Sequence, residues 1–155
     1  MNTKKLVLNM VTWVAVLFAY VGLFLPVIKE KTLNTIFPAG LTSFAEISTW
    51  GVLTTIFIGL GFLILLFLVA TSLLLIVNPD KEEKLNKIKN IFIYILWGVL
   101  LLTLAFVICG ATELANATVK CYPAIGYWFF FVGGLTASIT SFFDGLKLNK
   151  TNKEN

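Results

Sequence analysis

The stretch that decides the fold is residues 50–77, WGVLTTIFIGLGFLILLFLVATSLLLIV, which contains no charged side chain. As an α-helix rising about 1.5 Å per residue, it would be roughly 42 Å long. The hydrocarbon core of a bilayer is about 30 Å thick, and about 20 residues cross it. A chain of 155 residues is too short to cover such a helix on every side in water. We therefore predict a transmembrane helix that is tilted or projects beyond one face of the membrane.

Three further apolar runs give the chain the pattern of a four-span membrane protein. Apolar side chains make up 58% of the residues and charged ones 13%, whereas soluble domains usually have about 25% charged residues. The pattern predicts an all-α membrane protein, an antiparallel bundle of four transmembrane helices that forms one domain over residues 1–155. The expected spans are residues 6–28, 50–77, 91–109 and 123–143.

The lysines on the connecting segments predict the orientation of this bundle. Outer loops are expected at residues 29–49 and 110–122, a cytoplasmic connector at 78–90 and a cytoplasmic tail at 144–155. Cytoplasmic loops of membrane proteins carry an excess of Lys and Arg. The head, connector and tail carry nine of the twelve lysines, and the outer loops carry three. Both termini are therefore expected in the cytoplasm, and the plasma membrane is the expected location.

Local patterns predict three details of the outer side. Ile36 and Phe37, with further apolar residues at spacings near three to four, fit either a short interfacial helix or an irregular loop. Ser43 and Glu46 fit a capping box, which would start the second long helix near residue 44. Pro123 is expected in the first turn of the fourth helix, where proline is well tolerated.

The expected spans contain no Asp, Glu, Lys, Arg or His, and the chain has no histidine at all. Ion-coupled transporters and proton relays usually place ionisable groups inside the membrane. Histidine is the commonest general base near neutral pH and a common metal ligand. The sequence also lacks a phosphate loop, a nucleophile elbow, a zinc signature and a nucleic-acid module. It therefore predicts a non-enzymatic protein with no cofactor, no metal and no nucleic-acid partner.

Small residues recur at helical spacing in two of the spans. In lipid, such faces let helix backbones approach closely. They are predicted either to pack the helices of one bundle or to dock a second copy or another subunit. The faces consist of Gly133, Ala137, Ser141 and Gly145 in the fourth span, and of Gly51, Thr55 and Gly59 in the second.

Polar side chains within the spans need hydrogen-bond partners. Ser and Thr hydroxyls are expected to donate to a carbonyl one turn back in their own helix, and lining a polar path is the alternative. Trp13 and Trp97 lie deep in their spans. Their indoles are expected to find polar partners inside the bundle or to lie nearer an interface.

Two cysteines fall near the predicted outer face, where disulfides can persist. Cys109 ends the third expected span, and Cys121 precedes the fourth. A disulfide between them would close a short loop and contribute roughly 3 kcal/mol by loop-closure entropy. The alternative is two free thiols that behave as small apolar residues.

Lysines at the cytoplasmic surface are expected to attract anionic lipid head groups by about 1 kcal/mol each. This attraction is an effect of the membrane surface and does not indicate nucleic acid. The residues assigned to this contact are Lys4, Lys5, Lys81, Lys84, Lys87 and Lys89.

These observations favour a small multi-pass membrane protein that acts through helix packing, as an accessory or assembly subunit or a scaffold of a membrane complex. Its expected partners are membrane lipids and either a second copy or another membrane protein. A homo-oligomeric pore is the alternative, and a lipid-handling protein is a weaker one. The layout resembles that of many small four-span proteins. However, the W-GLW-C-C pattern of claudin-like proteins and the span-one glutamate of small multidrug transporters are absent, so no family is assigned.

Overall fold

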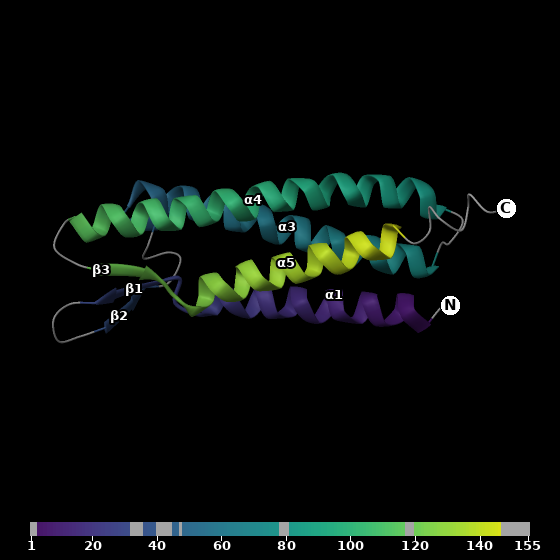
Figure 1. Ribbon diagram of the computed structural model, residues 1–155, viewed down its shortest axis with the longest axis horizontal. Coiled ribbons are helices and arrows are strands. Elements are labelled where there is room, and N and C mark those ends of the chain that lie inside the picture. The colour runs from purple at the N-terminus through teal and green to yellow at the C-terminus, as the bar shows by residue number, and fades with distance from the viewer. Residues whose placement is uncertain are drawn as a thin grey trace.

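The computed structural model describes residues 3–31, 36–39, 45–46, 48–77, 81–116 and 120–146, and its long helices lie side by side (Figure 1). Four of them are long and apolar enough to cross a membrane. The described part of the chain therefore has the helices of a small integral membrane protein. These helices are α1 (Thr3–Val21), α3 (Thr49–Val77), α4 (Glu82–Asn116) and α5 (Ile125–Leu146).

Contacts along the helices show how they are paired. α1 lies against α5 and α3 lies against α4, and in each pair the residue numbers rise along one helix as they fall along the other. Figure 1 shows the two pairs stacked on each other, with the start of α1 and the end of α5 at the same end of the bundle. The aromatic and hydroxyl contacts between the paired helices are Phe18 with Phe129, Thr12 with Thr140, Phe57 with Phe106 and Phe67 with Phe92.

α1 ends earlier than the expected span because a proline follows it. Leu25 is extended (φ −103°, ψ 156°), as residues before proline usually are. Between Val21 and Leu25 the chain makes one turn of 3-10 helix, η1 (Gly22–Phe24). The remaining residues of the expected span 6–28 lead into a strand and do not continue the helix.

The segment after α1 and the segment before α5 form a small antiparallel sheet, which the sequence did not predict. Its strands are β1 (Ile28–Lys31), β2 (Ile36–Ala39) and β3 (Lys120–Pro123), in the order β2-β1-β3. β2 contains Ile36 and Phe37, so these two residues lie in a strand and fit neither of the two alternatives predicted for them. Glu30 pairs with Phe37 on one side and with Cys121 on the other. The sheet thereby joins the segment after α1 to the segment before α5.

α3 begins at Thr49, later than the capping box predicted. Ser48 caps it, because its Oγ accepts the Trp50 N–H at 3.2 Å. Its hydroxyl also donates to Glu113 Oε2 at 2.7 Å, which ties the start of α3 to the last turns of α4. Ser43 lies outside the described residues.

α4 is longer than the expected span 91–109 at both ends. The charged residues of the predicted connector include Glu and Lys, which are good helix formers, and Glu82 and Glu83 in the first turn favour the helix dipole. At about 1.5 Å per residue the helix is roughly 52 Å long, so it exceeds the hydrocarbon thickness of about 30 Å. A helix of this length has to tilt in the membrane or project beyond its hydrocarbon core.

α5 begins at Ile125, so Pro123 ends strand β3 and is not in the first helical turn. Two backbone hydrogen bonds hold the start of α5 to the segment after η1. The Ala124 N–H donates to Val27 O at 2.7 Å, and the Gly126 N–H donates to Pro26 O at 2.8 Å. The second bond satisfies an amide that has no partner within the helix.

The core lies along the axis of the bundle and is built by large apolar side chains from each helix. Tyr127 and Phe130 fill the space between α5 and its neighbours near the sheet. Other fully buried core residues are Ala19, Leu65, Leu68, Ile93, Leu96, Leu100 and Val107.

Candidate functional site

The small-residue face predicted on α5 lies inside the chain at Gly133, Ala137 and Ser141. A Cβ on Gly133 would be 2.7 Å from the Ala15 carbonyl oxygen and 2.9 Å from the Ala19 Cβ, both on α1. Ala137 and Ser141, one and two turns further along α5, are buried. Gly145 falls in the last turn of the same helix. Of the two roles predicted for this face, the structure shows packing within one bundle.

The second predicted face, on α3, does not act as one surface. Gly51 is buried, and Thr55 is half-buried and donates its hydroxyl to Gly51 O at 2.9 Å. Gly59 instead lies on the exposed side of α3, where an added Cβ would meet no atom within 4 Å. Only Gly59 of this set remains open to an external helix.

A second open glycine lies on α4. Gly98 is exposed, and an added Cβ there also meets nothing within 4 Å. Sequence reasoning missed it, because no small residue follows it one turn later. Packing within the chain accounts for Gly22, Gly61 and Gly126, where an added Cβ would come within 2.7 Å of a neighbouring atom. The open glycines on the outward faces of α3 and α4 have no such explanation.

Most hydroxyl groups in the described spans donate within their own helices, as predicted. Seven of those in the second, third and fourth spans donate to a carbonyl three or four residues back at 2.7 to 3.0 Å. A hydroxyl that is already bonded in this way has less capacity to line a polar path. They belong to Thr54, Thr55, Thr71, Ser72, Thr103, Ser138 and Thr140.

Two of these hydroxyls also accept a tryptophan N–H, and both make the same arrangement. The Trp13 Nε1–H of α1 donates to Ser72 Oγ of α3 at 2.8 Å, and Ser72 donates on to Val69 O. The Trp97 Nε1–H of α4 donates to Ser138 Oγ of α5, also at 2.8 Å. These two hydrogen bonds between helices satisfy the deep indoles inside the bundle. They confirm the first of the two arrangements predicted for Trp13 and Trp97.

The axis of the bundle is filled where the structure describes it. The side chains of Leu65, Leu68 and Leu96 are fully buried there. An enclosed cavity near Phe62 and Phe130 measures about 10 Å³, roughly the space that one water molecule needs. The described interior therefore resembles a packed core more than a conduit.

The predicted disulfide does not form in this structure, because Cys109 is a free thiol. The reason is the length of α4, which continues seven residues beyond Cys109 to Asn116. This sets Cys109 about 10 Å back along the helix from its outer end. Cys121 lies on β3, which turns back and packs against α4 (Figure 1).

The lysines predicted to meet anionic lipid do not share one environment. Lys81, Lys84 and Lys87 are exposed, and Lys87 Nζ lies 2.8 Å from Glu83 Oε1 in an ion pair. Lys4 and Lys5 lie in the first turns of α1.

Lys89 is the exception, because it is only 1% exposed. It precedes Ile93 and Leu96 by four and seven residues on α4, and this spacing places all three on the inward face. Lys89 is therefore not available to a lipid head group at the surface, contrary to its assignment.

A polar groove of about 410 Å³ lies at the outer end of α3 and α4. Its lining includes Glu46, Ser48 and Glu113. Ser48 and Glu113 already bond to each other, so the groove belongs to the cap that starts α3.

Comparison of the chain with protein-family models, curated proteins and solved structures gives no match.

Proposed function

We propose that this protein is a non-enzymatic accessory or assembly subunit, or a scaffold, of a membrane complex. Its partner docks on the outward faces of α3 and α4, around Gly59 and Gly98. The observation that carries the proposal is that these exposed helical glycines have open space where a side chain would stand.

The filled interior supports this proposal. The span hydroxyls are bonded to their own helices, and the deep indoles are bonded to serines. The expected spans contribute no Asp, Glu, Lys, Arg or His for acid–base chemistry or ion coupling. We expect such a protein to bind its partners through its lipid-facing surface and through its short outer and inner segments.

The cost of a glycine in a helix supports the choice of surface. Glycine is about 1 kcal/mol less favourable than alanine in a helix interior. At Gly133 that cost is offset because the residue lets α1 and α5 approach. At Gly59 and Gly98 nothing in the part of the chain that the structure describes offsets this cost. A helix from another subunit would gain close backbone contact at these positions.

The test is the composition of the particle that is extracted gently from its native membrane. We expect the wild-type protein to remain with another polypeptide, or with further copies, in fixed ratio. Gly59→Leu and Gly98→Leu should release the partner while leaving the thermal stability of the bundle equal or slightly raised, because both positions are open and leucine favours the helix more than glycine does. Leu17→Phe, at an exposed site on α1, is the matched control and should retain the partner.

Two outcomes oppose the proposal. A wild-type particle that contains a single chain and no other polypeptide would remove the basis for a subunit role. Partner retention in the Gly59→Leu and Gly98→Leu variants would place the interface elsewhere. A closed ring of copies that conducts ions in liposomes would favour the alternative, a homo-oligomeric pore.

The proposal also includes an integral location in the plasma membrane, with both termini in the cytoplasm. The distribution of lysines supports this orientation. Single reporter tags at the two ends of the chain should be protected from a protease added to intact cells. Digestion of either tag from outside would contradict the orientation.

A further inference from the structure

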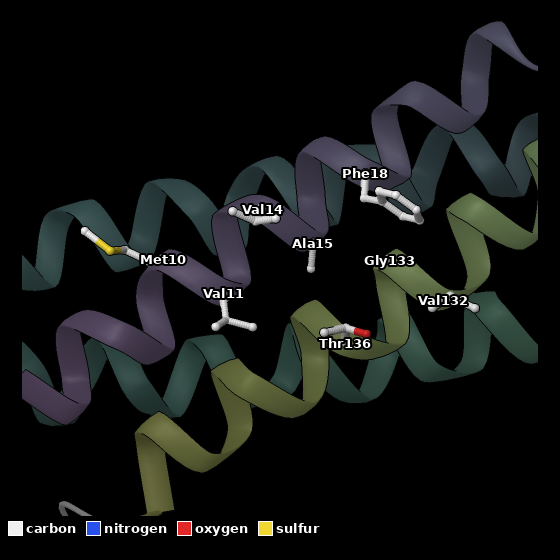
Figure 2. Close-up of a pocket in the computed structure, with 8 residues that line it drawn as sticks. All are labelled: Met10, Val11, Val14, Ala15, Phe18, Val132, Gly133 and Thr136. Atoms are coloured by element: carbon white, nitrogen blue, oxygen red, sulfur yellow. The ribbon is translucent and has the colours of Figure 1, made fainter.

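An open apolar groove of about 350 Å³ runs between α1 and α5 on the surface of the bundle (Figure 2). Ala15 of α1 and Gly133 of α5 form its floor, where the two helices touch. Val14 and Val132 form its two rims and are exposed. Small residues in the floor and larger ones on the rims create the recess.

The two ends of the groove differ. At one end Phe18 stacks on Phe129 with ring centroids 4.1 Å apart, and this pair closes the groove. At the other end lies Met10, whose side chain is exposed and flexible. The groove therefore opens toward the N-terminus of α1.

Its length matches one leaflet of a membrane. The eight helical steps from Met10 to Phe18 span about 12 Å along the helix. Half of a hydrocarbon core of about 30 Å is about 15 Å. A helix is about 10–12 Å across, which is too wide for a recess of this volume, whereas an extended acyl chain is narrow enough.

The charge beside the open end selects the kind of lipid. Lys4 and Lys5 lie in the first turns of α1, about 8 Å along the helix from Met10. A phospholipid whose tail enters the groove at Met10 would carry its head group at the level of these two lysines. Positive residues at this depth attract anionic head groups.

We propose that the groove between α1 and α5 binds one acyl chain of an anionic phospholipid, whose head group lies at the lysine-bearing start of α1. This inference is independent of the subunit role proposed above, because the groove lies on α1 and α5 and the open glycines lie on α3 and α4.

The test uses the purified full chain in nanodiscs of phosphatidylcholine that contain a minority of phosphatidylglycerol. Native mass spectrometry then counts the lipids that remain bound to the protein after it is released from the nanodisc. We expect one phosphatidylglycerol to be retained. Val14→Trp should reduce this retention at least tenfold, because the indole would fill the groove. Leu17→Trp is the matched control, since Leu17 is 66% and Val14 65% exposed on the same helix, and it should retain the lipid.

The head-group part of the proposal has its own variant. Replacing both lysines, Lys4→Gln with Lys5→Gln, should lower the preference for phosphatidylglycerol over phosphatidylcholine by roughly ten- to thirtyfold. Equal retention in Val14→Trp and Leu17→Trp would overturn the proposal. So would equal binding of the two lipids by the wild-type chain, or a second copy of the chain bound in place of the lipid.

Discussion

Gly22 and Gly126 bring the end of α1 and the start of α5 into backbone contact. A Cβ on Gly22 would lie 2.6 Å from the Gly126 carbonyl oxygen, and a Cβ on Gly126 would lie 2.7 Å from the Gly22 carbonyl oxygen. The Gly126 N–H also donates to Pro26 O. No side chain fits between these segments, so this contact sets the distance between α1 and α5 at their outer ends.

Gly126→Ala should therefore destabilise the bundle. The added methyl would meet three carbonyl oxygens within 2.7 Å, and backbone atoms cannot rotate away as a side chain can. Overpacking of this kind typically costs about 1–3 kcal/mol in the free energy of unfolding. Unfolding in detergent micelles measures the change. Gly98→Ala is the control and should leave stability equal or slightly raised, because its site is open. Equal stability of the two variants would show that the backbone contact at Gly126 is not needed.

The hydrogen bond from Trp13 to Ser72 should stabilise the contact of α1 with α3. A double-mutant cycle with Trp13→Phe and Ser72→Ala should give a coupling free energy of about 0.6 kcal/mol, and at most about 2 kcal/mol. The control cycle combines Trp13→Phe with Ser138→Ala, two residues that belong to different hydrogen bonds, and it should show weaker coupling. If both pairs gave the same value, the 2.8 Å hydrogen bond would not be the source of the coupling.

Ser48→Ala should loosen the start of α3. The variant removes the oxygen that accepts the Trp50 N–H and the hydroxyl that donates to Glu113. Loss of a helix cap typically costs about 1 kcal/mol. Hydrogen exchange at the Trp50 amide should become faster, and exchange in the middle of α3 should not change. Ser48→Thr keeps the hydroxyl and should restore protection at Trp50. Unchanged exchange in Ser48→Ala would mean that another group caps the helix.

The two cysteines of the chain should be alkylated without reduction. Cys109 is a free thiol, and the chain has no third cysteine to pair with Cys121. After denaturation without a reductant, the mass of the protein should rise by two alkyl groups, and added reductant should not change this result. A mass that rises only after reduction would show that a disulfide had formed.

The number of spanning helices could be predicted because the signal is local. An uncharged run such as residues 50–77 is apolar on every side, and its length alone requires lipid around it. Span hydroxyls such as that of Thr54 donate to a carbonyl of their own helix. This was predictable for the same reason, because donor and acceptor lie one turn apart.

The sheet and the helix ends were predicted poorly because they depend on contacts between distant residues. β3 pairs with β1 across most of the chain, and a strand of four residues has little pattern of its own. The end of α4 at Asn116 moved Cys109 away from the outer surface. The inward position of Lys89 was partly visible in its spacing from Ile93 and Leu96.

The sequence by itself determined that this protein crosses a membrane with four apolar helices, because hydrophobic length is a property of each segment alone. Only the tertiary structure decided what each small residue does. Gly133 and Gly59 look alike in the sequence, yet α1 covers the first and nothing in the described chain covers the second. Which helix stands beside a glycine depends on how all four helices pack, and no single segment encodes that arrangement.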